Sequence, residues 1–102
     1  MVKRTIIWTH NAVIQRRNIF TYWNNRNGSS EYSKRLLGLI RNRLILLTKF
    51  PEVGKLTDYP NLRVVLIENY LLFYFKNEDT ILIIAFWDNR QDPFQLFRNL
   101  TT

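Results

Sequence analysis

The chain has 102 residues, no cysteine, a net charge of +7 and a sequence pI near 10.2. With 46% hydrophobic residues it can bury a core as one domain covering residues 1–102, and the lack of cysteine excludes disulfides and thiolate chemistry. No run approaches the roughly 18 apolar residues of a membrane span, and the N-terminus lacks the apolar core of a signal peptide. We therefore expect a soluble, cytoplasmic protein without a membrane partner.

The positive charge is concentrated in the first half of the chain. Residues 1–50 contain ten Lys or Arg and one acid, whereas residues 51–102 contain five and seven, so the halves carry +9 and −2. Such a surface suits a nucleic acid or an acidic protein partner, although it can also be a solvated face that maintains solubility. The basic residues that we expect to contact a target are Arg16, Arg17, Arg35, Arg41, Arg43 and Lys55.

The first predicted element is a strand, followed by a helix. Residues 2–9 are β-branched or aromatic and predict the strand. Residues 11–25 show helical spacing, with Ala12 and Ile19 on one apolar stripe and Gln15 pointing away from it.

A loop and a second helix follow. Residues 24–30 are typical of a loop, with a Ser capping the next helix. Apolar residues recur every three or four positions over residues 31–49, and Pro51 stops the helix. Two amphipathic helices joined by a short loop predict an antiparallel hairpin.

Residues 52–61 are predicted to be a loop, and three strands follow at residues 62–67, 70–76 and 81–87. The polar turns between these strands are short, which predicts an antiparallel meander. The fold class is therefore α+β: an N-terminal strand, a helix hairpin and a three-stranded antiparallel meander form one sheet with the helices on one face. Because the later strands are almost entirely apolar, we expect the other face to be covered by the C-terminal tail or by a partner chain.

Charged residues at the strand ends are the candidates for chemistry. Arg63 interrupts an apolar strand, and Arg90 lies between Asp88 and Asp92 after the last strand. An arginine on a sheet is either a paired structural ion or an anion contact, and we interpret Arg90 as paired across the sheet with Arg63. His10, at a strand-to-helix junction, is expected to be a surface or capping residue, and no metal or cofactor site is predicted.

The order of these motifs resembles the RelE/ParE superfamily of type II toxin–antitoxin toxins over about residues 5–95. The motifs that carry the resemblance are Ala12, Tyr22-Trp23, Tyr32-Ser33, Phe50-Pro51-Glu52-Val53-Gly54, Leu62-Arg63, Asn69-Tyr70 and Trp87-Asp88-Asn89-Arg90-Gln91-Asp92-Pro93. The segment after the last strand is closest to ParE-type members. The resemblance implies a toxin that arrests growth and forms a hetero-oligomer with a cognate antitoxin. The antitoxin would wrap the toxin, covering the second sheet face and contacting Phe94, Leu96 and Phe97.

The resemblance leaves the activity open. ParE-type members inhibit DNA gyrase by binding and need no catalytic residues, which is the interpretation that we favour. RelE-type members cleave mRNA on the ribosome. In that case Arg63 and Arg90 would hold the scissile phosphate, with Asp88, Glu52 and Lys55 contributing, but the late tyrosine or histidine of those enzymes is missing. A third alternative is a basic nucleic-acid-binding module, although aromatic residues at stacking spacing are lacking.

Overall fold

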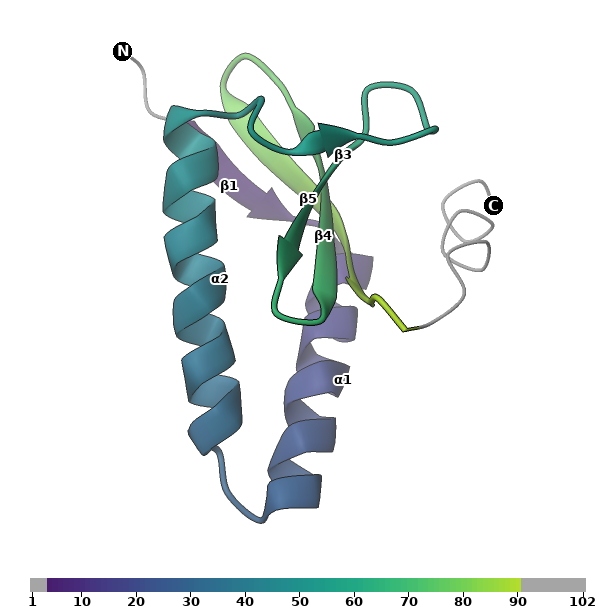
Figure 1. The fold of residues 1–102 in the computed structure, drawn as a ribbon. Helices are drawn as coiled ribbons and strands as arrows, with labels where there is room; N and C mark the ends of the chain where they lie inside the picture. The colour runs from purple at the N-terminus through teal and green to yellow at the C-terminus, as the bar shows by residue number, and fades with distance from the viewer. Residues whose placement is uncertain (1–3, 91–102) are drawn as a thin grey trace.

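The computed structural model describes residues 4–90 and contains two helices and five strands in that part of the chain (Figure 1). In chain order they are β1 (Thr5–Trp8), α1 (His10–Asn27), α2 (Glu31–Lys49), β2 (Lys55–Leu56), β3 (Arg63–Ile67), β4 (Tyr70–Lys76) and β5 (Thr80–Asp88). The two helices form an antiparallel hairpin whose closed end projects beyond the strands (Figure 1).

The strands form one mixed sheet in the order β1-β5-β4-β3-β2. Strands β3, β4 and β5 pair antiparallel as consecutive neighbours, which confirms the predicted meander and the α+β class. Strand β1 pairs parallel to β5, an orientation that the sequence pattern did not specify. The predicted loop over residues 52–61 was partly wrong, because it contains β2, which pairs with the start of β3. Two residues are too few to show strand periodicity.

The ends of α1 have clear local causes. The Thr9 hydroxyl accepts a hydrogen bond from the Ala12 N–H at 3.3 Å, so Thr9 caps the helix while His10 lies exposed in the first turn. Gly28 ends the helix with a φ of 66°, a left-handed angle that glycine adopts easily. The helix is therefore longer than the predicted residues 11–25.

Helix α2 ends at Lys49, before Phe50 and Pro51, as predicted. Ser30 occupies its N-cap position but makes no side-chain capping bond, so the expected serine cap was wrong.

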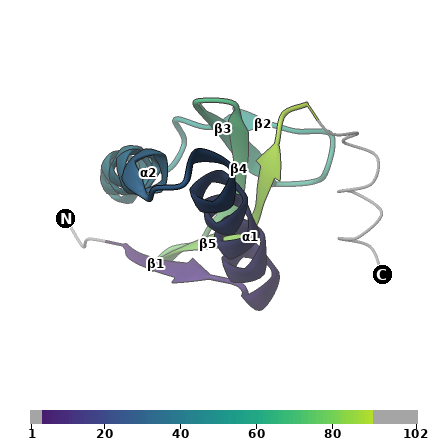
Figure 2. The same ribbon diagram turned by 90° about the horizontal axis from the view of Figure 1, so that it is seen from below.

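Both helices pack on the same face of the sheet, because buried residues of α1 and α2 belong to one core with residues of β3, β4 and β5. Helix α2 contacts both β1 and β3, which lie on opposite sides of the central strands β5 and β4. Figure 2 shows α2 end-on, beside the curved sheet. The buried residues of this core are Ala12, Leu36, Ile40, Leu47, Val65, Ile67, Tyr70, Leu72, Tyr74, Ile81, Ile83 and Phe86. Each large side chain buried here contributes about 1.5–3 kcal/mol, so this core holds the helix hairpin on the sheet.

The opposite face of the sheet carries a smaller cluster. Leu62, Phe73 and Ala85 are buried there, and Tyr59 from the loop before β3 packs against them. Leu66, near the end of β3, is 52% exposed. The residues predicted to bind an antitoxin, Phe94, Leu96 and Phe97, lie outside the described residues.

Candidate functional site

A β-bulge turns the end of β5 toward α1. The pairing of β4 with β5 shifts by one residue at Ile84, which has no partner in the register. An extra residue reverses the alternation of side chains, so Phe86 joins the core under the helices and Trp87 packs on the other face. Asp88, two residues after Phe86, therefore lies on the same side as α1.

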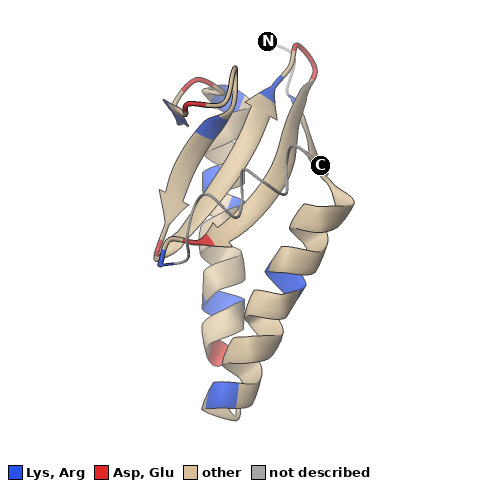
Figure 3. Ribbon diagram, turned by 90° about the vertical axis from the view of Figure 1, so that its right-hand side faces the viewer, with Lys and Arg blue, Asp and Glu red and all other residues tan. Residues whose placement is uncertain are grey.

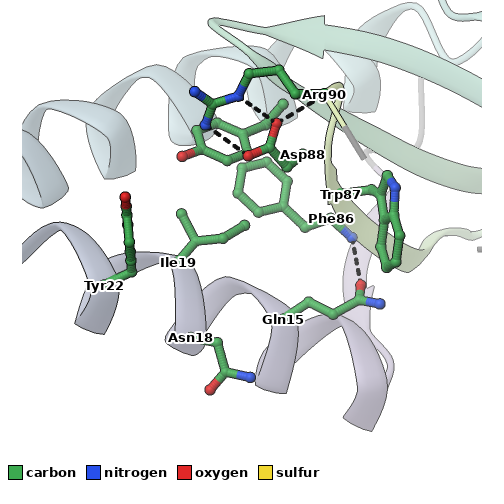
Figure 4. Close-up of a pocket in the computed structure, with 9 residues that line it drawn as sticks. Gln15, Asn18, Ile19, Tyr22, Phe86, Trp87, Asp88 and Arg90 are labelled. Carbon is green, nitrogen blue, oxygen red and sulfur yellow. Dashed lines mark hydrogen bonds and ion pairs between the residues drawn. The ribbon is translucent and has the colours of Figure 1, made fainter. Parts of the chain in front are cut away.

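A cleft of about 520 Å³ lies between α1 and the end of β5 (Figure 4). Its lining residues are Gln15, Asn18, Ile19, Tyr22, Tyr70, Phe86, Trp87, Asp88 and Arg90. Polar residues line it from both sides, since α1 supplies two amides and a phenol, and the strand end supplies an acid and a guanidinium. This cleft holds two of the three predicted catalytic candidates, Asp88 and Arg90, and we call it the β5 cleft.

Asp88 and Arg90 form a two-pronged ion pair at the rim of the β5 cleft. One carboxylate oxygen of Asp88 accepts bonds from the Arg90 backbone N–H at 2.9 Å and from Nε at 3.0 Å, and the other accepts from Nη2 at 2.8 Å. The hydrogen bonds from Arg90 hold the pKa of Asp88 below its ordinary value, although partial burial opposes the shift. The Arg90 side chain is 64% exposed, so the pair presents a guanidinium to solvent.

Gln15 closes the inner wall of the β5 cleft. Its side-chain oxygen accepts a hydrogen bond from the Phe86 backbone N–H at 2.8 Å, beyond the point where β1 stops pairing with β5. The prediction that Gln15 points away from the core was therefore wrong. The signal was available, because Gln15 lies three residues after the buried Ala12 and four before Ile19, on the same stripe of the helix.

Aromatic side chains of β4 and β5 line the β5 cleft. Tyr70 stacks on Phe86 with ring centroids 5.2 Å apart, and its hydroxyl accepts a hydrogen bond from Trp23 Nε1. Burial raises the pKa of Tyr70, so this phenol stays protonated at neutral pH. The Nε1 atom of Trp87 is buried and finds no acceptor among residues 4–90. These aromatic residues were not predicted as site residues.

Arg63 lies at a different site, at the opposite end of β3 and β4 from the β5 cleft. Its Nη1 donates to the carbonyl oxygens of Gly54 at 2.8 Å and Glu52 at 3.1 Å. In the same loop, the buried Tyr74 hydroxyl donates to the Pro51 carbonyl at 2.8 Å and accepts from the Gly54 N–H at 2.9 Å. We call these residues the loop clamp, because two side chains from the sheet fix the backbone of residues 51–54.

The structure does not bring Arg63 and Arg90 together. Arg63 pairs with Tyr74 of β4, whereas Asp88 pairs with Tyr70, four residues earlier on the same strand. At about 3.3 Å per residue this separates the two backbone positions by roughly 13 Å along the strand. The interpretation of Arg90 as paired across the sheet with Arg63 was therefore wrong.

The loop residues that were expected to help are engaged elsewhere. The Glu52 carboxylate forms an ion pair with Lys76, and the hydrogen bond from Lys76 lowers the pKa of Glu52. Lys55 lies exposed on β2, the edge strand next to β3.

The basic residues of the helices separate into two places. Figure 3 shows Lys and Arg distributed along both helices. Arg16, Arg17 and Arg41 line one groove between α1 and α2. Arg35 forms an ion pair with Glu68 at 3.2 Å, and Arg43 lines a smaller pocket that also includes Glu68. The sequence identified a basic hairpin but could not show that only part of it forms a shared surface.

Residues 4–90 contain no cluster of three or more His, Cys, Asp or Glu side chains suited to holding a metal ion. Among the helices of that same range, none is long and apolar enough to cross a membrane.

Comparisons with known proteins place this geometry in a family. The model of the family described as "ParE toxin of type II toxin-antitoxin system, parDE" matches residues 6–93. A solved structure described as "Chromosomal ParDE TA system from P. aeruginosa" has the same fold, with a TM-score of 0.71 and 16% identity over 84% of this chain and 96% of that chain. No curated protein sequence matches the chain. Because the family model covers most of its length, the chain belongs to the ParE toxin family of type II toxin–antitoxin systems.

Proposed function

We propose that residues 1–102 act as one toxin domain in the cytoplasm, arresting growth by binding and poisoning a target such as DNA gyrase. A cognate antitoxin holds the toxin silent in a hetero-oligomer. Membership of the ParE family supports the toxin role, and the likeness of its fold to a ParDE system supports an antitoxin partner.

The observation that favours action by binding over catalytic RNA cleavage is the separation of Arg63 from Arg90. RNA cleavage without a metal needs cationic phosphate contacts beside a base and an acid. Arg63 donates its hydrogen bonds to loop carbonyls, and Arg90 is paired with the neighbouring Asp88. The backbone positions of Arg63 and Asp88 lie about 13 Å apart along the strands. The two arginines are therefore not placed to contact one phosphate group together.

The two buried tyrosines are poorly suited to replace the missing general base. Tyr70 and Tyr74 are buried, and burial raises the pKa of both phenols, which disfavours the phenolate that a general base requires. His10 is exposed on the first turn of α1 and belongs neither to the lining of the β5 cleft nor to the loop clamp. The RelE-like alternative therefore gains no general base from these three residues.

We assign the target contact to the exposed surfaces around the hairpin and the β5 cleft. Arg90 projects at the rim of the β5 cleft, and the remaining basic residues lie on α1, α2 and β2. Phe94, Leu96 and Phe97 remain our candidates for antitoxin contacts, as the family resemblance implies.

Induction of the chain in bacterial cells tests the proposal. Plasmid topology and the 5′ ends of translated mRNA are followed after induction, in parallel with growth. We expect growth arrest with relaxed or cleaved plasmid and intact mRNA. Cuts at codon positions would instead identify a ribosome-dependent nuclease, and normal growth would reject both toxin activities and favour a nucleic-acid-binding module.

A further inference from the structure

The β5 cleft has the size and lining of a site for a small ligand. Its volume of about 520 Å³ falls within the range of roughly 300–1,000 Å³ that is common for sites of small organic molecules. The apolar side chains of Ile19, Phe86 and Trp87 contribute to its lining. Figure 4 shows Gln15, Ile19 and Tyr22 in a row along α1, facing the end of β5. A ligand in the cleft would therefore lie along α1, with polar groups at both of its ends.

The end of the β5 cleft at Tyr22 presents two guanidinium groups. Arg26 Nη1 donates a hydrogen bond to the Tyr22 hydroxyl at 3.1 Å, and Arg26 forms no ion pair in the described part of the chain. Arg90 uses Nε and Nη2 on Asp88, which leaves its Nη1 without a partner among the described residues. The pKa of Arg90 is raised chiefly by its hydrogen bond with Asp88 and also by the electrostatic influence of Tyr70 and Tyr22, so both phenols lie near its guanidinium. Two arginines beside one carboxylate leave spare donors and an excess of positive charge, which suit a phosphate group.

The other end of the β5 cleft, at Gln15, offers hydrogen-bond donors beside aromatic side chains. The side-chain oxygen of Gln15 already accepts from the Phe86 N–H, so its amide nitrogen is the group left for a ligand. Gln15 and Tyr22 are seven residues apart on α1, which separates the two ends of the cleft by about 10 Å. Guanine carries two acceptors, O6 and N7, on one edge, whereas adenine presents an amino donor beside N7. An amide with a free nitrogen and an occupied oxygen therefore favours guanine over adenine.

We propose that the β5 cleft binds a guanine nucleotide, with the base beside Phe86 and the phosphate between Arg26 and Arg90. The nucleotide is either free or an unpaired nucleotide of a DNA strand, since both present the same base and phosphate. Other aromatic phosphates fit less well, because a phenyl ring offers no acceptor to the amide nitrogen of Gln15. The site goes beyond the proposed function, because it concerns a nucleotide and not the protein target of a toxin.

Titration calorimetry with the purified full chain tests the site. The probes are dGMP, dAMP, deoxyguanosine without phosphate, and a single-stranded DNA oligonucleotide that contains guanine. Arg26→Gln removes a phosphate contact, and Lys49→Gln is its matched control, exposed on α2, outside the cleft and with the same loss of charge. Gln15→Glu keeps an oxygen for the Phe86 N–H and replaces the donating nitrogen with an acceptor. Thermal unfolding is recorded for each variant.

We expect wild type to bind dGMP about tenfold more tightly than dAMP, and Gln15→Glu to lose this preference. Arg26→Gln should weaken dGMP binding about fivefold and leave the binding of deoxyguanosine unchanged, whereas Lys49→Gln should change dGMP binding by less than about twofold. Oligonucleotide binding that depends on Arg26 and is tighter than that of dGMP would identify a DNA strand as the source of the nucleotide. Weaker oligonucleotide binding would identify a free nucleotide.

The proposal is overturned if wild type does not bind dGMP, if it binds dGMP and dAMP alike, or if Arg26→Gln and Lys49→Gln lose equal affinity. Should Gln15→Glu fail to fold, NMR spectra of wild type supply the same test. Added dGMP should shift the side-chain amide signals of Gln15 more than those of Asn42, which lies on α2 outside the cleft, and the reverse pattern would reject the site. Growth arrest is not a readout of these experiments, so the nucleotide site and the toxin activity can fail separately.

Discussion

Arg63 and Arg90 lie at opposite ends of the β3–β4–β5 meander and make different kinds of contact. In the loop clamp, the guanidinium of Arg63 lies over backbone carbonyls, and a buried tyrosine completes the arrangement. In the β5 cleft, the guanidinium of Arg90 is held by one neighbouring carboxylate and stays largely in solvent. An arginine that satisfies backbone groups stabilises the fold, whereas an exposed one is available to a partner. Of these two arginines, only Arg90 in the β5 cleft is therefore exposed for contact with a partner.

Among the substitutions considered, the one at Gly54 in the loop clamp should reduce the stability of the fold most. A Cβ placed there would collide with the Tyr74 hydroxyl and with its ring, which would lie 2.7 Å away, and both residues are buried. We expect Gly54→Ala to lower the free energy of unfolding by about 3 kcal/mol in denaturant titrations, because the buried ring has to move and its bonds are lost. Gly38→Ala is the control, since its Cβ meets nothing within 4 Å in the middle of α2, where alanine favours a helix. Equal unfolding midpoints in the two variants would contradict the loop clamp.

Arg63→Ala should have the next largest effect. Two loop carbonyls lose a charged donor, so we expect a loss of about 2 kcal/mol in the free energy of unfolding. Arg90→Ala, at the exposed end, should change the free energy of unfolding less than Arg63→Ala does, because solvent screens its ion pair. Growth arrest by Arg63→Ala should fall only as far as the amount of folded protein falls. A stable Arg63→Ala protein without toxicity would show that Arg63 acts directly on the target.

Gln15→Ala should destabilise the inner wall of the β5 cleft. The Phe86 N–H would lose its acceptor, at an expected loss of about 1 kcal/mol in the free energy of unfolding. Asn18→Ala, on the same helix and in the same cleft, is the matched control and should change stability by less than about 0.5 kcal/mol. The amide of Phe86 should also exchange its hydrogen faster in Gln15→Ala alone. Unchanged exchange would mean that Gln15 does not protect this amide.

The Asp88–Arg90 pair should contribute least to the free energy of unfolding, and its contribution should depend on pH. Because the pKa of Asp88 is lower in the folded state than its ordinary value, the pair stabilises the fold above pH about 4 and loses that contribution as pH falls through the lowered pKa. We expect Asp88→Asn to lower the free energy of unfolding at pH 7 by less than about 1 kcal/mol and to flatten the acid limb of its pH profile. An acid limb that matches wild type would assign the pH dependence to other carboxylates.

Local signals in the sequence sufficed for most of the fold. Gly28 and Pro51 mark the helix ends, and the polar turns between apolar runs mark the meander. The parallel pairing of β1 with β5 joins residues more than seventy positions apart, which no local pattern encodes. Strand β2 is defined by its partner rather than by its own two residues.

The sites were harder to predict, because both depend on tertiary detail. The bulge at Ile84 decides which face receives Asp88, and strict alternation would have placed it on the other side of the sheet. Arg63 was recognised as unusual on its strand, but its partners are carbonyls of a loop that closes only in the folded chain. Gln15 shows the opposite case, since its helical position already indicated a buried hydrogen bond.

The central claim, that this ParE-family chain acts by binding and not by chemistry, is tested most directly with purified components. DNA gyrase supercoils a relaxed plasmid while the chain is titrated in, and a translation reaction with labelled mRNA receives the same titration. The account predicts that supercoiling falls as the chain approaches the molar amount of gyrase, while the mRNA stays intact at every dose. Cleavage of mRNA by substoichiometric chain, with supercoiling unaffected, would contradict it.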